Sequence, residues 1–365
     1  MLREERRRRV AEAMQEARID ALVVYGNAWQ GDYLRYAADF GILEGNGIAV
    51  ATADGAVALF LDSATELERA EGETAGLTLH LAPDIAHDVA AHLGRLGNRR
   101  IAAAPRRFLP SFLADPARGF ALEDATVLFD RLLMHKLAAE HDALRRAAAL
   151  ADEAYVVFRA AARVGARQYE ICGAVEAFLR KKGCPDNFMI LGSGGKDVLG
   201  MTPPSDRVVA EGDLVTTELT PAVEGYYAQI CRTLVVGRAT DAQRRAHALY
   251  LEALEAGIAA VRPGATAADV ARAENDVFRK HGFGDYVTDQ YTRVRGHGLG
   301  LFADSKPHIL EDVDTKLAAG MSLVVHPNTY HPEVGYMVLG DSVLVTGTGA
   351  EIMTRTKRVL FETGA

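Results

Sequence analysis

Residues 212–237, GDLVTTELTPAVEGYYAQICRTLVVG, contain two apolar, β-branched runs on either side of Val223-Glu224-Gly225. This pattern predicts a β-hairpin whose turn lies at those three residues. Further along the chain, MSLVVHPNTY and VGYMVLGDSVLVTGTG (within 321–349) predict more antiparallel strands. The hairpin therefore belongs to a larger antiparallel sheet.

Helical patterns flank these strands. A long stretch from about Leu133, MHKLAAEHDALRRAAALADEAYVVFRAAARVG, has apolar residues at three- and four-residue spacing and ends near Gly165. Residues 240–264 predict a second helix, and residues 266–282 a third, with Thr266 as its N-cap. A helix pair followed by strands occurs twice. Long helices on one face of a curved antiparallel sheet make an α+β domain.

The first part of the chain alternates helix and strand signals, which predicts an α/β domain. Its basic N-terminus, with Leu2, Val10 and Met14 on one face, predicts an amphipathic helix rather than a transit peptide, since Glu4 and Glu5 interrupt it. The other predicted elements are a strand at 21–26, a hairpin at 47–61 with its turn at Asp54-Gly55, a strand at 78–82, a helix after it, and a strand at 99–105. We predict two domains, residues 1–132 and 133–365.

Composition limits the class of protein. The 365 residues are 49% hydrophobic and 25% charged, as in globular proteins of two domains. A net charge of -8 provides no basic surface for nucleic acid or anionic lipid, and no apolar run approaches the roughly 20 residues that span a bilayer. Three cysteines without metal-type spacing indicate a reducing compartment. We expect a cytoplasmic protein without membrane or nucleic-acid partners.

Several of these blocks together resemble one family. The 212–237 segment, RGHGLGL, AAGMSLVVHPNTY and GDSVLVTGTGAEIMT stand in family order, and LAAEHDALRRAAALADEAY, VRPGATAADV, ARIDALVVYG and DYLRYAADF agree as well. The whole chain is similar to the creatinase/prolidase/aminopeptidase P (M24) family. The resemblance implies a creatinase-type α/β N-terminal domain, a pita-bread C-terminal domain and a homodimer. Family members cleave C–N bonds in small nitrogenous substrates.

The resemblance also implies where a metal site would lie. Peptidase members hold two divalent metal ions with two Asp, one His and two Glu, whereas creatinase-like members work without metal. The five ligand positions fall here at Glu218, Gln229, His297, His326 and Gly340. One carboxylate, an amide and two imidazoles cannot balance the charge of two dications. We therefore expect no dinuclear centre and no cofactor, although a single metal ion on Glu218, His297 and His326 stays open.

Other site positions also depart from the family. The His before the first hairpin of the second half falls near Met201, the peptidase His beyond GHG falls at Asp304, and the creatinase carboxylate falls at Cys231. We assign these three, with Gln229 and Tyr227, to substrate binding; the alternative for Cys231 is a small buried hydrophobe, and for Tyr227 sheet packing. We interpret GSGGKD (192–197) as a flexible loop at the mouth of the site.

The leading interpretation is a metal-independent hydrolase of an amide, amidine or cyclic C–N bond in a small, carboxylated metabolite. His297 and His326 are the candidates for proton transfer near neutral pH, and Glu218 orients or charge-stabilises one of them. The alternative for Glu218 is a structural ion pair with Arg232. Two other functions stay open: a non-catalytic module that binds a ligand or protein, and a mononuclear metallohydrolase.

Overall fold

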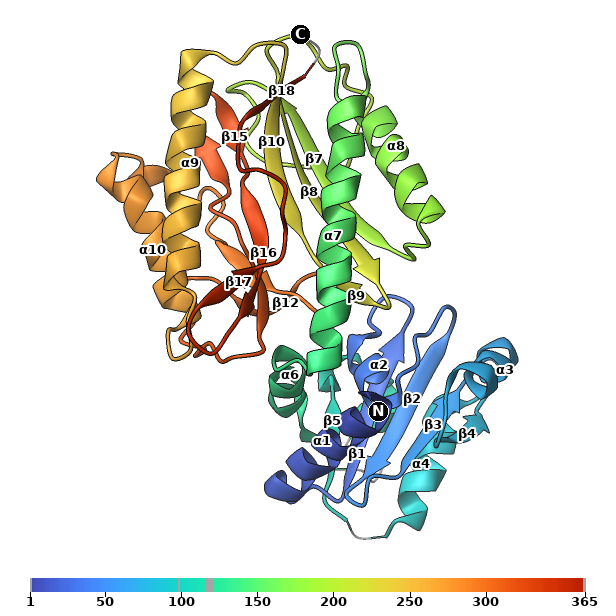
Figure 1. Cartoon of the computed structure of the whole chain (residues 1–365). Coiled ribbons are helices and arrows are strands. Elements are labelled where there is room, and N and C mark those ends of the chain that lie inside the picture. Colours follow the sequence, from blue (N-terminus) through green and yellow to red (C-terminus); the bar gives the residue numbers. More distant parts are fainter. Residues whose placement is uncertain (1, 98, 116–120, 364–365) are drawn as a thin grey trace. The chain divides into compact units, whose positions relative to one another are not determined.

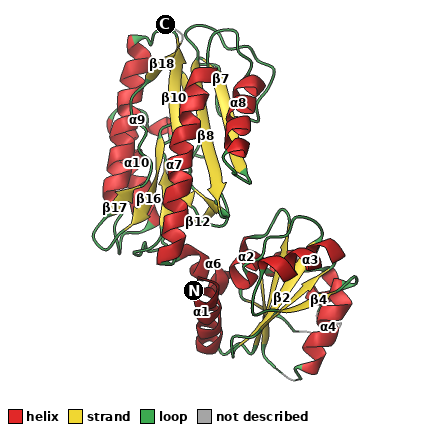
Figure 2. Ribbon diagram, turned by 45° about the vertical axis from the view of Figure 1, so that its right-hand side comes forward, coloured by secondary structure: helices red, strands yellow, loops and turns green. Residues whose placement is uncertain are grey.

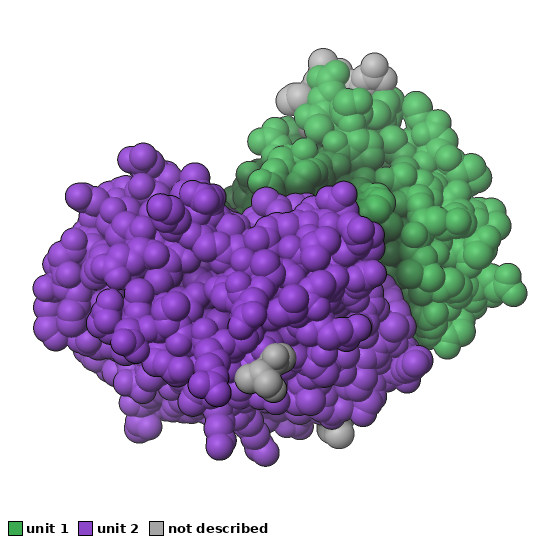
Figure 3. Space-filling model, turned by 90° about the horizontal axis from the view of Figure 1, so that it is seen from above, with its two compact units in different colours: residues 1–133 green, residues 134–365 purple. Residues whose placement is uncertain are grey.

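The computed structural model describes residues 2–97, 99–115 and 121–363. Two compact units divide the chain, residues 1–133 and 134–365 (Figure 3). Each unit has its own sheet and its own buried core. No described helix is long and apolar enough to cross a bilayer.

The first unit is built on a six-stranded sheet in the order β4-β3-β2-β1-β5-β6. The β1–β2 and β2–β3 pairs are antiparallel, and β1–β5, β3–β4 and β5–β6 are parallel. Its strands are β1 Ala21–Asn27, β2 Asn46–Thr52, β3 Val57–Leu61, β4 Thr78–Leu81, β5 Ile101–Ala104 and β6 Glu123–Asp124. Its helices are α1 Leu2–Ala17, α2 Asp32–Ala38, α3 Ala64–Glu73, α4 Ile85–Arg95, α5 Ser111–Ala114 and α6 Thr126–Met134. This arrangement confirms the predicted α/β domain.

The second unit contains a ten-stranded, largely antiparallel sheet whose main order is β12-β11-β13-β16-β10-β8-β7. These strands are β7 Asn187–Gly194, β8 Leu214–Val223, β10 Ile230–Val236, β11 Gly296–Gly298, β12 Ser305–His308, β13 Ser322–Val325 and β16 Gly340–Val345. Shorter strands are β9 Tyr226–Tyr227, β14 Thr329–His331, β15 Gly335–Met337, β17 Ala350–Ile352 and β18 Phe361–Thr363. The predicted β8–β10 hairpin is present, and both Glu224 and Gly225 adopt positive φ in its turn (52° and 82°).

Four helices cover one face of this sheet (Figures 1 and 2): α7 Ala138–Ala161, α8 Gln168–Lys181, α9 Asp241–Ala260 and α10 Ala267–Lys280. The α7–α8 pair packs on one half of the sheet, and the α9–α10 pair packs on the other half. Thr266 caps α10 as predicted, since its side chain accepts a hydrogen bond from the backbone N–H of Asp269. These helices leave the opposite face of the curved sheet to form the site.

Two local predictions were wrong. The helix predicted from Leu133 is two helices, because α6 ends at Met134 and α7 begins at Ala138. The Glu140 side chain accepts a hydrogen bond from the Leu137 N–H, which caps a new helix there. The first three residues of the predicted 192–197 loop extend β7, paired with β8. Helix α8 was not predicted, although Ile171, Val175 and Leu179 follow the four-residue spacing of a helix.

Candidate active site

One cavity in the second unit gathers side chains from distant parts of the sequence. Its volume is about 630 Å³, in the usual range for small-molecule sites. The residues that line it are Asp186, Phe188, Ile190, Gly200, Met201, Glu218, Tyr227, Gln229, Thr292, Val294, His297, Phe302, Ala303, Asp304, His326 and Tyr336. Seven of the eight residues assigned to the site from the sequence lie in this lining.

Cys231 is the exception, and its assignment to substrate binding was wrong. Its side chain is fully buried and does not line the cavity. Burial raises the pKa of the thiol well above its ordinary value, so the sulfur stays protonated and is a poor nucleophile. Cys231 instead lies behind the site, where it accepts a hydrogen bond from Gln229 Nε2 at 3.3 Å.

Strand register brings the central residues together. Cys231 on β10 is opposite Glu218 on β8 and opposite Gly340 on β16. Directly opposed residues of antiparallel strands face the same side of a sheet. His297 on β11 and His326, just after β13, come from the adjacent strand pair, and their ring centroids are 5.6 Å apart. The cavity therefore has one carboxyl group and two imidazoles at its centre.

The carboxyl group of Glu218 is held by an amide rather than by a charged partner. Asn328 Nδ2 donates a hydrogen bond to Glu218 Oε1 at 2.8 Å. Burial raises the pKa of Glu218 to about 7, although the hydrogen bond from Asn328 acts to lower this pKa. The alternative of a structural ion pair with Arg232 was wrong, because Arg232 forms its ion pair with Asp341. Glu218 can therefore exchange a proton near neutral pH.

Both imidazoles are neutral. Burial lowers the pKa of His297 below its ordinary value, and burial, together with the repulsion that two protonated imidazoles would meet, lowers the pKa of His326 to about 3. In neutral His297, Nδ1–H donates to the Gly298 carbonyl at 3.0 Å, which leaves a lone pair on Nε2. Glu218 thus titrates near neutral pH, and the expectation that His326 does so was wrong.

Asn328 is the site residue that sequence reasoning missed. It is fully buried, its Oδ1 accepts from the Leu339 N–H at 3.1 Å, and its Nδ2 fixes Glu218. The signal was present in the sequence, because Asn328 stands where the resemblance places a glycine. A side chain at that position has to enter the space beside the site.

Gly340 is required by the packing behind His326. A Cβ at residue 340 would lie 2.6 Å from His326 Cβ, 2.9 Å from the Val325 carbonyl oxygen and 3.1 Å from Cys231 Sγ. The first two distances are too short for any side chain unless the backbone moves. Residue 340 therefore has no room for a side chain between His326 Cβ, the Val325 carbonyl and Cys231.

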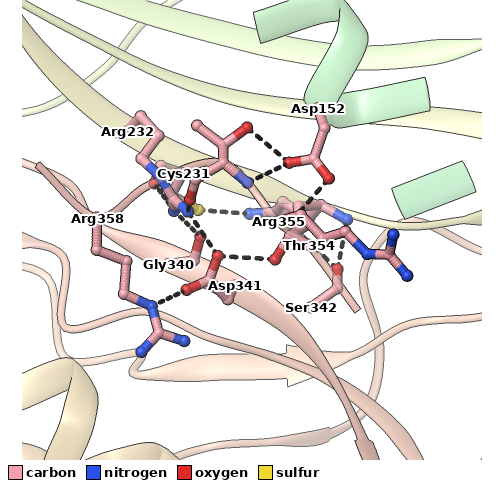
Figure 4. A network of polar contacts seen from close by, with 11 residues as sticks. Asp152, Cys231, Arg232, Gly340, Asp341, Ser342, Thr354, Arg355 and Arg358 are labelled. Atoms are coloured by element: carbon pink, nitrogen blue, oxygen red, sulfur yellow. Dashed lines mark hydrogen bonds and ion pairs between the residues drawn. The ribbon is translucent and has the colours of Figure 1, made fainter. Parts of the chain in front are cut away.

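A buried ionic network lies beside Cys231 and Gly340 (Figure 4). Asp341 is 1% exposed and forms ion pairs with Arg232 at 2.7 Å and Arg358 at 2.6 Å. Its Oδ1 also accepts a hydrogen bond from Thr354 Oγ1 at 2.7 Å. Arg232 donates further to the carbonyl oxygens of Cys231 and Gly340. The strands that carry the site are thus joined by charge as well as by backbone hydrogen bonds.

The rim of the cavity is acidic. Partial burial alone would raise the pKa of Asp304. The hydrogen bond from His308 Nε2 and the nearby His297 outweigh burial and hold this pKa below its ordinary value. Tyr227 donates its hydroxyl hydrogen to Asp186. The described residues of the lining include no Lys or Arg. The cavity thus lacks the cation that the expected carboxylated metabolite would pair with.

The two metal ions implied by the family do not fit these residues. Gln229 is neutral and its amide N–H points to Cys231, Asn328 donates to Glu218, and Gly340 offers no ligand. Among residues 2–97, 99–115 and 121–363, no three His, Cys, Asp or Glu side chains are placed to hold an ion. Glu218, His297 and His326, for which a single metal ion was left open, are thus not placed together as its three ligands in this structure.

Comparisons with known proteins find matches in both units of the chain. The model of metallopeptidase family M24 matches residues 142–347, and that of the creatinase/prolidase N-terminal domain matches residues 6–134. The Xaa-Pro dipeptidase of Pyrococcus furiosus is 31% identical over 61% of this chain and 63% of its own length. The Xaa-Pro dipeptidase of Pyrococcus horikoshii is 28% identical over 60% of this chain and 62% of its own. The matches thus span less than two thirds of these relatives.

Solved structures agree over nearly the full length. The Xaa-Pro dipeptidase from Bacillus anthracis has a TM-score of 0.85 and 26% identity, and covers 99% of each chain. Dipeptidase PepE from Mycobacterium ulcerans has a TM-score of 0.85 and 27% identity, and covers 99% of this chain and 98% of its own. Both resemble this chain in its two-domain, pita-bread architecture.

Proposed function

This chain belongs to metallopeptidase family M24, and from that premise we propose that it hydrolyses a C–N bond in a small substrate with its own side chains instead of two metal ions. One observation carries the proposal. Glu218 faces a cavity of about 630 Å³ that it shares with two neutral imidazoles, and Asn328 holds its carboxyl group in place. This is an acid–base site of a size suited to a small molecule.

The reaction needs one group that can accept a proton and return it. Glu218 in its carboxylate form takes a proton from water as the water oxygen attacks the carbonyl or amidine carbon. The protonated Glu218 then gives this proton to the nitrogen as the C–N bond breaks. The products of an amide are a carboxylic acid and an amine. A pKa of about 7 suits both halves of this cycle.

The neutral side chains around Glu218 have supporting roles. The imidazole N–H of His326 stabilises the negative charge that develops on the attacked carbonyl oxygen, since the N–H of His297 is bonded to the Gly298 carbonyl. Gln229 keeps its Oε1 to accept a hydrogen bond from the substrate, since its Nε2 is bonded to Cys231. Met201, Phe302 and Tyr336 provide apolar surface for the rest of the substrate. Tyr227 contributes to the wall beside Asp186.

The test is a panel of small amides and amidines, incubated with protein that has been stripped by a chelator, with release of ammonia or amine as the readout. We expect turnover that is lost in Glu218→Gln and kept in Glu153→Gln, a matched change at an exposed residue of α7. Turnover that survives Glu218→Gln would overturn the assignment. Binding without turnover would favour a non-catalytic binding module.

The homodimer and the cytoplasmic location stay predictions. Light scattering of the purified protein at several concentrations tests the first, and a mass of one chain throughout would contradict it. Fractionation of the source cells tests the second.

A further inference from the structure

We propose that this cavity selects a positively charged substrate, in which an ammonium or related cation is joined by an apolar stem to the C–N bond that is cleaved. The inference rests on the proposed function and adds the class of substrate. It replaces the carboxylated metabolite expected from the sequence.

The charges of the lining support this choice. Three acidic residues, Asp186, Glu218 and Asp304, line the cavity, and its described lining has no Lys or Arg. The two histidines of the lining add no positive charge, because both are neutral. A cation in the cavity would be attracted by the rim carboxylates, whereas a carboxylate would be repelled by them.

Arg295, two residues before His297, is a buried cation that could reverse this conclusion. Its side chain is fully buried and does not belong to the lining. Its Nη1 donates to the Asn328 carbonyl at 2.7 Å, and its Nε donates to Asn275 Oδ1. Two of its nitrogens are thus bonded within the protein, and the third, Nη2, is buried and does not reach the lining.

The uncharged part of the lining suits the rest of such a molecule. Phe188, Tyr227, Phe302 and Tyr336 bring aromatic rings to the cavity, and aromatic faces attract cations as well as apolar stems. Ile190, Met201 and Val294 extend the apolar wall.

His326 gives an independent sign of a ligand. It lines the cavity, is only 4% exposed, and its Nδ1 has no hydrogen-bond partner among the described residues. A buried nitrogen without a partner costs free energy. After a flip of the ring that turns this nitrogen toward the cavity, a ligand N–H that pairs with it would remove this cost. An amine or amide ligand supplies such an N–H.

The experiment compares three amides of nearly equal length that differ at one end. δ-Aminovaleramide ends in an ammonium group, hexanamide has a methyl group in its place, and adipic monoamide has a carboxylate. Calorimetry measures binding to the chelator-stripped protein, and ammonia release is measured separately. We expect δ-aminovaleramide to bind roughly fivefold or more tightly than the other two, with the preference reduced by added salt.

Two variants test the source of the preference. Asp186→Asn and Asp304→Asn each remove one rim charge with little change of shape, and each should weaken δ-aminovaleramide roughly two- to fivefold without weakening hexanamide. Asp314→Asn, an exposed residue outside the lining, should change neither. Equal or tighter binding of adipic monoamide, a preference that survives both rim variants, or no binding of any probe would overturn the inference. Preferential binding without ammonia release would overturn the proposed hydrolysis and leave the selectivity intact.

Discussion

Replacing Asp341 by Asn should destabilise the second unit strongly. The carboxylate is 1% exposed and accepts from three side chains, Arg232, Arg358 and Thr354. Arg232 is also only 1% exposed, so Asp341→Asn leaves a buried guanidinium without its counter-ion. Breaking a buried pair by removing one charge costs about 3–5 kcal/mol. The strands at Cys231 and Gly340, whose carbonyl oxygens accept hydrogen bonds from Arg232, should lose order at the same time.

Equilibrium unfolding in urea measures this change, with Asp276→Asn as the matched control. Asp276 forms an exposed pair with Arg279 at 2.8 Å, and such pairs contribute within about 1 kcal/mol. A free-energy change for Asp341→Asn that is no larger than that of the control would refute the reasoning.

The same network predicts how stability depends on pH. Burial alone would raise the pKa of Asp341, but the charges of Arg232 and Arg358 outweigh it and hold the pKa below its ordinary value. A carboxyl group with a lowered folded pKa contributes stability above its unfolded pKa of about 4, and this is lost as pH falls through the folded pKa. The wild type should lose this contribution in acid, whereas Asp341→Asn has none to lose.

Three further changes address the cavity itself. Gly340→Ala should lower the free energy of unfolding by roughly 1–3 kcal/mol, since its Cβ would meet His326 Cβ at 2.6 Å; unchanged thermal unfolding would show that the site has room for it. Activity should rise with pH through about 7 as Glu218 ionises. Glu218→Gln should be slower by roughly a hundredfold and should show no such rise. A pH profile shared by both proteins would argue against Glu218 as the base. Asn328→Ala removes a hydrogen bond that lowers the pKa of Glu218, so the midpoint of that profile should move to higher pH; a midpoint that stays or moves to lower pH would contradict the role given to Asn328.

The sequence predicted most of the fold because its signals are local or occur in ordered blocks. The β8–β10 hairpin follows from two apolar runs around Glu224-Gly225, and α10 follows from its Thr266 cap. The break between α6 and α7 was missed because residues 135–137 contain no Pro or Gly. The new helix is instead capped by the Glu140 side chain, which accepts a hydrogen bond from the Leu137 N–H. A glutamate within a helical stretch is not a distinctive signal for a break.

The sequence predicted which residues line the site, but not which of them titrates near neutral pH. Motif positions located Glu218, Gln229, His297 and His326, and these four do line one cavity. Which of them carries a proton near neutral pH depends on burial, which comes from the packing of several strands. Burial lowers the pKa of both imidazoles and raises that of Glu218, and sequence spacing holds no measure of this effect. Strand register puts Cys231 on the same side of the sheet as Glu218, and it is burial by the surrounding packing that keeps its side chain out of the lining.

If this site works without the metal ions of its family, added metal ions should not change its rate of hydrolysis. The rate of amide hydrolysis is determined for chelator-stripped protein, alone and with added Mn²⁺, Co²⁺ or Zn²⁺. The donor set of Glu218, Gln229, His297 and His326, without a side chain at Gly340, predicts the same rate in every case. Hydrolysis that appears only when a metal ion is added would contradict the account.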